Sequence, residues 1–579
     1  MKARLDRRQV LRGATFAGGG AALSAWMPAW AAPVAAGIVA PPPTLGGEEI
    51  ALRIARQSVR VDGRVARAIG TNGTVPGPLI RLREGQDVRL RVTNALDTTS
   101  SLHWHGLLVP PQYDGVPGVS FPGITPRSTF LYEFPIRQAG TYWYHSHSGF
   151  QEQLGLRGPI VIDPAGTDPV AADREHVILL SDHSPLSPET LFRRLKADPG
   201  GFDFQKQTLG ELLAGKDLPL AERLAWGGMR MDPADIADAT GAIYTYTING
   251  YGPEDNWTAL FQPGERVRLR IINGAAMTTF NIRIPGLAMT VVQADGQDVR
   301  PVETDEFQIG VAETYDVIVT PAGDRAYTLV GESVDRSGLA RATLAPRAGM
   351  AAPLPAPRPR PLATMTDMGA GMEAGKGMDM AGMDHAAPPA MAMSAMPMRD
   401  FSRAPGVARG AGVATIAPMP RDRTAEPGQG LDHVGHRVLV YADLAARDRN
   451  PDVRAPSRAV DVHLTGNMER YMWSFDGVKM SDTMAPIPFR EGERVRVTLI
   501  NDTMMGHPIH LHGHFFELVT GQGDHAPRKH SVLVAPGGKV SFDFTADTPG
   551  DWAFHCHLLY HMAAGMMRVV SVRRDGATA

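Results

Sequence analysis

The sequence predicts an all-β protein built from three β-sandwich domains. The main observation is a thirteen-residue unit that occurs three times, as LREGQDVRLRVTN, FQPGERVRLRIIN and FREGERVRVTLIN, ending at Asn94, Asn273 and Asn501. In each copy a Gly turn precedes apolar residues that alternate with Arg or Thr, and this period of two is typical of a half-buried strand. The expected domains span residues 45–165, 172–345 and 431–575.

Residues 346–430 interrupt this pattern. They are rich in Pro, Ala, Gly and Met and show no sustained period, which is typical of a flexible, low-complexity linker or insert. Ten of the 34 residues from Met365 to Met398 are methionine. Because this stretch lacks bulky aliphatic residues, we expect it to add nothing to a domain core.

Residues 1–31 have the pattern of an export signal rather than of a folded segment. Basic residues in DRRQVLRG precede a short apolar run and a small-residue cleavage pattern, Ala29-Trp30-Ala31. Arg7-Arg8 is similar to the start of a twin-arginine motif, although Asp6 departs from that motif. The apolar run is short and is broken by Pro28, so a membrane anchor is not expected. We therefore predict a periplasmic protein with no stable membrane span.

Cys556 is the single cysteine in 579 residues. Exported chains often use disulfides, but one cysteine cannot form an internal one, and an exposed free thiol would be prone to oxidation. His555 and His557 flank this cysteine and His561 follows it, which favours a metal ligand over a buried, inert thiol.

Four His-x-His pairs occur, two in the first expected domain and two in the third. Residues i and i+2 of a strand point to the same face, so each pair aims two imidazoles in one direction. Histidines follow the repeat's Asn by nine and eleven residues in the outer copies, whereas the middle copy has Ile282 and Ile284 there, as a spacer would. Eight converging imidazoles exceed the needs of one zinc ion and suit three metal ions with open positions. The pairs are His103/His105, His145/His147, His510/His512 and His555/His557.

The third domain adds His507, Cys556, His561 and Met566. Two imidazoles, a thiolate and a weak thioether form the ligand set of blue copper sites. The first domain has Ser100 where the third has His507, so only the third domain can build this site. Strand alternation directs Cys556 away from its two histidine neighbours, so one strand would connect two metal sites by a short covalent route.

HWHG, HSH, HPIHLHGH and HCHLLYHMAAGM resemble, in this order, the four copper signatures of the multicopper oxidases. Within that family, the leader, the methionine-rich stretch and NMERYMWSFDG resemble the bacterial periplasmic copper-resistance oxidases of the copper-resistance protein A type. The resemblance covers nearly the whole chain after the signal. It implies three cupredoxin-like Greek-key domains that hold four copper ions, one of type 1, one of type 2 and two of type 3.

The resemblance also implies a ligand set. Type 1 copper matches His507, Cys556, His561 and Met566; type 2 copper matches His103 and His510; the type 3 pair matches His105, His145, His147, His512, His555 and His557. Asp114, in PPQYDGVPG, matches the acidic residue that helps to deliver protons to bound oxygen, and a turn residue before Gly115 is the alternative. Met562 stands where some cuprous oxidases have Glu, so a second proton donor is not identified.

The implied reaction is one-electron oxidation of a donor at type 1 copper, coupled to four-electron reduction of O2 to water. Thioethers select Cu(I), so the methionine-rich stretch predicts that Cu(I) is the electron donor and that the reaction serves copper resistance. A laccase-like phenol oxidase and a copper-sequestering protein are the alternatives. Expected partners are O2, Cu(I) or another small reducing substrate, and a periplasmic copper carrier, whereas the formal net charge of −3 gives no indication of nucleic-acid binding. The candidate Cu(I) ligands are Met365, Met368, Met372, Met378, Met380, Met383, His385, Met391, Met393, Met396 and Met398.

Overall fold

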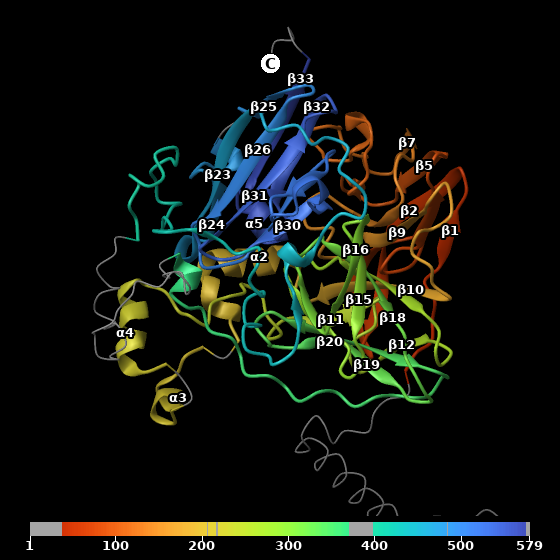
Figure 1. Ribbon diagram of the computed structural model, residues 1–579, viewed down its shortest axis with the longest axis horizontal. Coiled ribbons are helices and arrows are strands. Elements are labelled where there is room, and N and C mark those ends of the chain that lie inside the picture. Colours follow the sequence, from red (N-terminus) through yellow and green to blue (C-terminus); the bar gives the residue numbers. More distant parts are fainter. Residues whose placement is uncertain (1–36, 205, 216–217, 370–397, 483–484, 575–579) are drawn as a thin grey trace, which may run out of the picture.

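The structure is a computed structural model that describes residues 37–204, 206–215, 218–369, 398–482 and 485–574. Strands dominate it, which confirms the all-β fold class. Figure 1 shows three strand-rich units that follow one another along the chain, from red-orange through green to blue. The expected export signal, residues 1–31, lies outside the described residues. Among the described helices, none combines the length and the apolar character needed to cross a membrane.

The first unit packs a four-stranded sheet, β3-β2-β5-β7, against a five-stranded sheet, β1-β4-β9-β8-β6. Its repeat strand β5 buries Val88, Leu90 and Val92 and exposes the residues between them, as the period of two predicts. The strands are β1 (Thr44–Gly46), β2 (Glu49–Val61), β3 (Arg64–Thr71), β4 (Leu79–Arg83), β5 (Asp87–Asn94), β6 (His103–His105), β7 (Thr129–Pro135), β8 (Gly140–His145) and β9 (Arg157–Asp163).

The middle unit has two six-stranded sheets, β11-β10-β13-β18-β15-β16 and β12-β20-β19-β14-β17-β22. Its repeat strand β13 is buried on both faces, because Arg268 and Arg270 pair with Asp316 at 2.7 and 2.9 Å instead of facing solvent. The strands are β10 (Arg174–His183), β11 (Thr245–Ile248), β12 (Trp257–Leu260), β13 (Val267–Asn273), β14 (Phe280–Arg283), β15 (Met289–Ala294), β16 (Gln297–Thr304), β17 (Glu306–Ile309), β18 (Thr314–Val319), β19 (Tyr327–Ser333) and β20 (Leu339–Ala345).

A helical excursion leaves the middle unit between β10 and β11. It contains α2 (Pro188–Ala197), α3 (Leu209–Leu213) and α4 (Leu220–Gly228), and Figure 1 shows α3 and α4 projecting from one side of the molecule. Ser187 caps α2, because its side chain accepts a hydrogen bond from the backbone N–H of Thr190. This excursion brings residues 229–240 of the middle unit next to the third unit.

The third unit pairs a six-stranded path, β24-β23-β26-β31-β28-β29, with the sheet β25-β33-β32-β27-β30. Its elements are β23 (Arg458–Asn467), β24 (Met472–Phe475), β25 (Ile487–Arg490), β26 (Arg494–Asn501), β27 (His507–Leu511), β28 (Phe516–Leu518), β29 (Arg528–Lys529), β30 (Ser531–Val534), β31 (Gly538–Thr545), β32 (Gly550–Cys556), α5 (Leu559–Ala563) and β33 (Met567–Arg573).

The described parts of the expected linker, residues 346–369 and 398–430, pack closely against the units. Strand β21 (Arg421–Asp422) pairs with β31, and β22 (Val438–Leu439), just beyond the linker, pairs with β17 of the middle unit. Arg358 forms ion pairs with the buried Glu306 and with Glu332. The expectation that Met365–Met398 adds nothing to a core is wrong at both ends, since Met368 is 2% exposed in a hydrophobic cluster and the half-buried Met398 packs against that cluster. The limits of the domains stay predictions.

The asparagine that ends each repeat anchors the loop that follows it. Asn94, Asn273 and Asn501 are 0% exposed, and each donates its side-chain N–H groups to backbone carbonyls at 2.7–3.2 Å. Each side-chain oxygen also accepts a backbone N–H two residues further on. Buried amides need such partners, so the three loops take similar paths. In the outer units the strand that follows this loop begins with histidine, and it is β6 at the edge of its sheet and β27 between β32 and β30.

Candidate metal centre

Strand register brings the His-x-His pairs together. In the first unit β6 and β8 are antiparallel, with His103 opposite His145. In the third unit β27 and β32 are antiparallel, with His510 opposite His555. The two sets of imidazoles meet between these units, where the ring centroids of His105 and His510 lie 3.8 Å apart.

Eight imidazoles form one cluster, which we call the histidine cluster. Ring nitrogens lie within 4.8 Å of one another in the groups His103/His105/His510, His103/His147/His512 and His105/His145/His557. His555 joins them, because its Nε2 lies 3.1 Å from Nε2 of His512. The members are His103, His105, His145, His147, His510, His512, His555 and His557.

The hydrogen bonding of the histidine cluster fits copper. In six members at least one buried ring nitrogen has no hydrogen-bond partner among the described residues. These members are His103, His105, His145, His147, His510 and His557. In His103 and His510 the other ring nitrogen, Nδ1, donates a hydrogen bond to a backbone carbonyl. The acceptor is Asp114 at 2.7 Å for His103 and His530 at 2.6 Å for His510. Unpartnered buried nitrogens are costly, and a ligating imidazole uses one nitrogen for the metal and the other for an outer hydrogen bond.

The protonation state of the cluster also suits a metal. Burial, reinforced by neighbouring imidazoles, lowers the pKa of six members well below the ordinary value. Burial lowers the pKa of His555 to about 4. These imidazoles are therefore neutral at physiological pH, which is the form that binds metal ions.

A second group lies wholly within the third unit. Sγ of Cys556 is 3.6 Å from Nδ1 of His507 and 3.9 Å from Nδ1 of His561, and the two nitrogens are 3.2 Å apart. All three side chains are 0% exposed, as is Met566, whose carbonyl accepts the Cys556 N–H at 3.1 Å. Burial raises the pKa of the Cys556 thiol, so a metal ion that binds there must displace its proton.

Outer contacts hold both imidazoles of this second group, which we call the type 1 group after the copper type that the sequence analysis expects there. Oγ1 of Thr503 lies 2.8 Å from Nε2 of His507, and Oδ2 of Asp238 lies 2.6 Å from Nε2 of His561. Each contact occupies Nε2, so Nδ1 faces the cysteine. Burial raises the pKa of Asp238 to about 7, and Tyr471 donates a hydrogen bond to the same oxygen at 2.9 Å. Asp238 belongs to the middle unit, which is therefore more than a spacer.

The end of β32 links the two groups. Cys556 faces the type 1 group, whereas its neighbours His555 and His557 belong to the histidine cluster. Alternate residues of a strand point to opposite faces, which explains why consecutive side chains serve different groups. The covalent path from Sγ to each neighbouring imidazole passes through a single peptide unit.

Asp114 touches a cluster histidine from each outer unit. It follows the 3-10 turn Pro111–Tyr113 and is 0% exposed. Its Oδ2 accepts a hydrogen bond from Nδ1 of His512 at 2.9 Å, and its carbonyl accepts one from His103. The position fits an acid that serves the cluster, and its role in proton delivery stays a prediction.

Glu152 is a carboxyl group that the sequence analysis does not identify. Its side chain is 3% exposed, its Oε2 lies 2.7 Å from Nδ1 of His145, and burial raises its pKa well above the ordinary value. The available signal is its position, seven residues after His145 in HSHSGFQE, which places it in the loop that leaves β8. Asp238 has no such signal, because only tertiary packing brings it to His561.

The other expected site residues separate into two sets. Met365, Met368 and Met398 lie together in a hydrophobic cluster near the type 1 group. The remaining candidate Cu(I) ligands lie outside the described residues: Met372, Met378, Met380, Met383, His385, Met391, Met393 and Met396.

Comparison with known proteins identifies the family. Profiles of multicopper oxidases match residues 53–167, 228–347 and 454–576. Copper resistance protein A of Escherichia coli is 46% identical over 615 residues, which cover 99% of this chain and 100% of that protein. The chain belongs to the multicopper oxidases. Multicopper oxidase MmcO of Mycobacterium tuberculosis is 32% identical, covering 90% of this chain and 86% of that protein.

Solved multicopper oxidases share the fold. The laccase from Botrytis aclada has a TM-score of 0.62 at 22% identity, covering 92% of this chain and 88% of that chain. A multicopper oxidase from Campylobacter jejuni, described as a metallo-oxidase, has a TM-score of 0.57 at 18% identity, covering 93% of this chain and 96% of that chain. The protein is therefore a copper-dependent oxidoreductase that uses a reducing substrate and O2, and its histidine groups fit the type 1, type 2 and type 3 copper ions of this family.

At about pH 8, above the pKa of about 7 of Asp238, we expect Asp238→Asn to raise the reduction potential of the type 1 copper, because it removes a negative charge beside His561. A redox titration followed at the blue absorption measures this, and about 59 mV corresponds to a tenfold change in a one-electron equilibrium. Asp335→Asn is the control, since Asp238 and Asp335 line one small cavity but Asp335 accepts the backbone N–H of Ser337 instead of contacting His561. Equal potentials in the wild type and Asp238→Asn would contradict the expectation.

Proposed function

We propose that this multicopper oxidase oxidises Cu(I) to Cu(II) in the periplasm and thereby contributes to copper resistance. Four Cu(I), one O2 and four protons would give four Cu(II) and two waters. The proposed ligands are His507, Cys556, His561 and Met566 for type 1 copper, His103 and His510 for type 2, and His105, His145, His147, His512, His555 and His557 for type 3. Bound there, the coppers would accept single electrons at type 1 and reduce O2 at the other three ions.

A group of methionines beside the type 1 group supports Cu(I) as the donor. Seven of the eleven members of one hydrophobic cluster are methionine, and we call these seven the methionine cluster. Thioethers are soft ligands that select Cu(I). Methionine is also common in ordinary hydrophobic cores. However, four of the seven come from segments outside the methionine-rich stretch and pack against the three that belong to it. The seven are Met229, Met231, Met365, Met368, Met398, Met468 and Met504.

An open hollow gives a cation access to these thioethers. Its volume is about 970 Å³, and its lining contains four cluster methionines, five acidic residues and four basic residues. Burial raises the pKa of Asp203 to about 9 and the pKa of Asp235 well above its ordinary value, so these two carboxyls are neutral at physiological pH. The thioethers, rather than a net negative charge, therefore favour Cu(I) over a phenol in this hollow. Thr503 also lines the hollow, and its Oγ1 contacts His507. A donor held there would lie next to the type 1 group.

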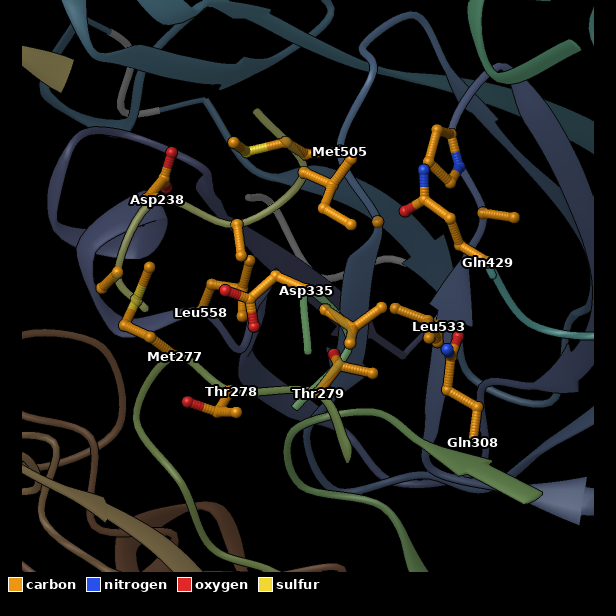
Figure 2. Close-up of a pocket in the computed structure, with 17 residues that line it drawn as sticks. Asp238, Met277, Thr278, Thr279, Gln308, Asp335, Gln429, Met505, Leu533 and Leu558 are labelled. Carbon is orange, nitrogen blue, oxygen red and sulfur yellow. The ribbon is translucent and has the colours of Figure 1, made fainter. Parts of the chain in front are cut away.

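A second cavity, which Asp238 lines, is too small for an organic substrate. Figure 2 shows Asp238 and Met277 on one side of this cavity and Gln308 and Gln429 on the other. Its volume is about 50 Å³. Pockets for small organic ligands usually measure about 300–1,000 Å³. This cavity therefore offers no place for a phenol, whereas the hollow of about 970 Å³ is large enough for one, so the thioethers there and not its size favour Cu(I). The complete histidine cluster favours an oxidase over a copper store.

The test replaces thioethers without changing volume. We expect the triple change Met229→Leu, Met231→Leu and Met468→Leu to lower kcat/KM for Cu(I) about tenfold or more, while oxidation of a small phenol is retained. Met→Leu conserves volume and usually costs less than about 1.5 kcal/mol, so the fold should persist. Met289→Leu, in the core of the middle unit, is the matched control. If the triple variant and the control have equal Cu(I) kinetics, the methionine cluster is only packing.

A deletion tests the contribution of the rest of the methionine-rich stretch separately from that of the methionine cluster. Residues 370–397 can be replaced by a short Gly/Ser linker, because backbone bonds hold Gly369 to Met419 and Met398 to Ile416. Loop closure entropy changes slowly with length, so stability should change little. We expect weaker Cu(I) oxidation and unchanged phenol oxidation in steady-state oxygen uptake. Unchanged Cu(I) kinetics and copper tolerance would assign a linker role to this stretch.

The proposed compartment is the periplasm, reached through the twin-arginine-like signal in residues 1–31. The similarity to proteins named copper resistance protein A supports a role in copper resistance. A periplasmic copper carrier would be the natural source of Cu(I). Fractionation of cells that express the wild type or Arg7→Lys/Arg8→Lys tests the signal, since loss of the arginine pair should retain the protein in the cytoplasm.

A further inference from the structure

A hairpin of the middle unit reaches the back of the histidine cluster. Asp295-Gly296 joins β15 to β16, and the φ angles of 48° and 73° are those that a tight hairpin turn requires. A Cβ added to Gly296 would lie 2.3 Å from the ring of Tyr142, so the tip packs directly on β8 of the first unit. Only glycine fits this approach.

The Asp295 side chain faces the third unit. Its Oδ2 accepts the backbone N–H groups of His530 at 3.2 Å and Ser531 at 3.0 Å. Its Oδ1 lies 3.0 Å from Nζ of Lys529 and accepts the Thr314 N–H at 3.0 Å. One carboxylate therefore holds three consecutive residues of another unit.

Lys529 is fixed by a second carboxylate of the middle unit. Its Nζ lies 3.1 Å from Oε1 of Glu313, which also accepts a hydrogen bond from the hydroxyl of Tyr441 at 2.7 Å. Lys529, Asp295 and Glu313 are each 0% exposed. Removing one partner of such a buried pair leaves an uncompensated charge, so the three groups constrain one another strongly. We call them the ion triplet.

The residues that follow Lys529 contact two members of the histidine cluster. The His530 carbonyl accepts the Nδ1–H of His510 at 2.6 Å. Oγ of Ser531 lies 3.2 Å from the same nitrogen and 3.3 Å from Nε2 of His105. A continuous set of contacts thus runs from the middle unit through residues 529–531 to one imidazole from each outer unit.

We propose that Asp295 is a positioning residue that orients His510 and His105, so that the middle unit sets the geometry of the type 2 side of the copper cluster. The bond made by one ring nitrogen determines where the other nitrogen points, and these outer bonds begin at Asp295. The proposal rests on the ligand assignment above but not on the identity of the electron donor.

The test compares type 2 with type 1 copper in the same holoenzyme. In Asp295→Ala we expect type 2 affinity, measured by its electron paramagnetic resonance signal during copper titration, to fall about 10–100-fold, as loss of an outer-shell partner typically causes. The blue type 1 absorption per chain should stay at the wild-type value. Asp295→Asn retains an acceptor for His530 and Ser531 and should recover most of the affinity. Glu306→Ala removes another fully buried carboxylate of the middle unit, paired with Arg358, and should leave type 2 copper unchanged.

Two further variants keep the outcome decisive. Ser531→Ala removes one hydroxyl, so it should fold even if Asp295→Ala does not, and it should shift the type 2 spectrum with the blue absorption intact. His510→Ala is the reference for a lost ligand. A normal type 2 signal in His510→Ala would overturn the ligand assignment. The positioning role would be overturned if His510→Ala lost that signal while Asp295→Ala or Ser531→Ala kept the wild-type copper affinity and spectra. An equal loss in Glu306→Ala would also overturn it.

Discussion

Replacing Cys556 with Ser is expected to abolish both the intense blue absorption and the oxidase activity. Sγ of Cys556 is the single thiol close to His507 and His561, and a hydroxyl is a hard, weakly ligating substitute. The effect should exceed the about 10–100-fold loss that accompanies an outer-shell change. The measurements are the visible spectrum of the copper-loaded protein and steady-state oxygen uptake.

Controls separate this loss from unfolding. Circular dichroism should show a folded β-protein, although a buried hydroxyl without partners can cost about 1–3 kcal/mol. Met505→Leu changes a buried neighbour in the same core and conserves volume, so it should keep its colour. A blue and active Cys556→Ser protein would rule out the type 1 assignment.

Replacing His512 with Ala should have the opposite spectral result. His512 belongs to the histidine cluster, where its Nδ1 donates to Asp114 and its Nε2 lies 3.1 Å from that of His555. The type 1 group shares no side chain with this cluster, so the blue absorption should remain and should still bleach when a donor is added. Oxygen uptake should fall to background, because electrons reach type 1 copper but do not proceed.

A histidine outside the cluster provides the control for this change. Nε2 of His176, in the middle unit, donates to the Leu260 carbonyl, and His176→Ala should therefore retain both colour and turnover. Disappearance of the blue absorption from a folded His512→Ala protein would show that the ligands are divided wrongly between the two groups.

Much of the fold is predictable because its signals are local. A Gly turn, a period of two and a closing asparagine recur in three copies, and ligand pairs two residues apart need only one strand to point together. The start of α2 also has a local signal, Ser187 followed by Pro188, which the sequence analysis overlooks. The burial of Arg268 and Arg270 has none, since their partner Asp316 is 46 or more residues away.

The outer supports of the site are harder to predict for the same reason. Asp238 reaches His561 across 323 residues, and Asp295 reaches Ser531 across 236. Neither contact follows from spacing or composition, because each depends on how complete units pack. Glu152 is intermediate, since it lies on the loop that follows its histidine, although many loop carboxyls serve no site. Sequence patterns therefore predict which imidazoles the fold gathers around the thiol and into the histidine cluster, and they miss the groups that orient them.

The division of the histidine cluster between the first and third units has a consequence for biosynthesis. Four imidazoles lie from His103 to His147, and the other four lie from His510 to His557, beginning roughly 360 residues later. At a synthesis rate of about 5–20 residues per second, the first half waits for about 20–70 s before the second half exists. A copper ion captured in that interval would meet half of its ligands and no type 1 partner. Correct metallation therefore requires copper to be withheld until the last residues of the chain have been made and folded.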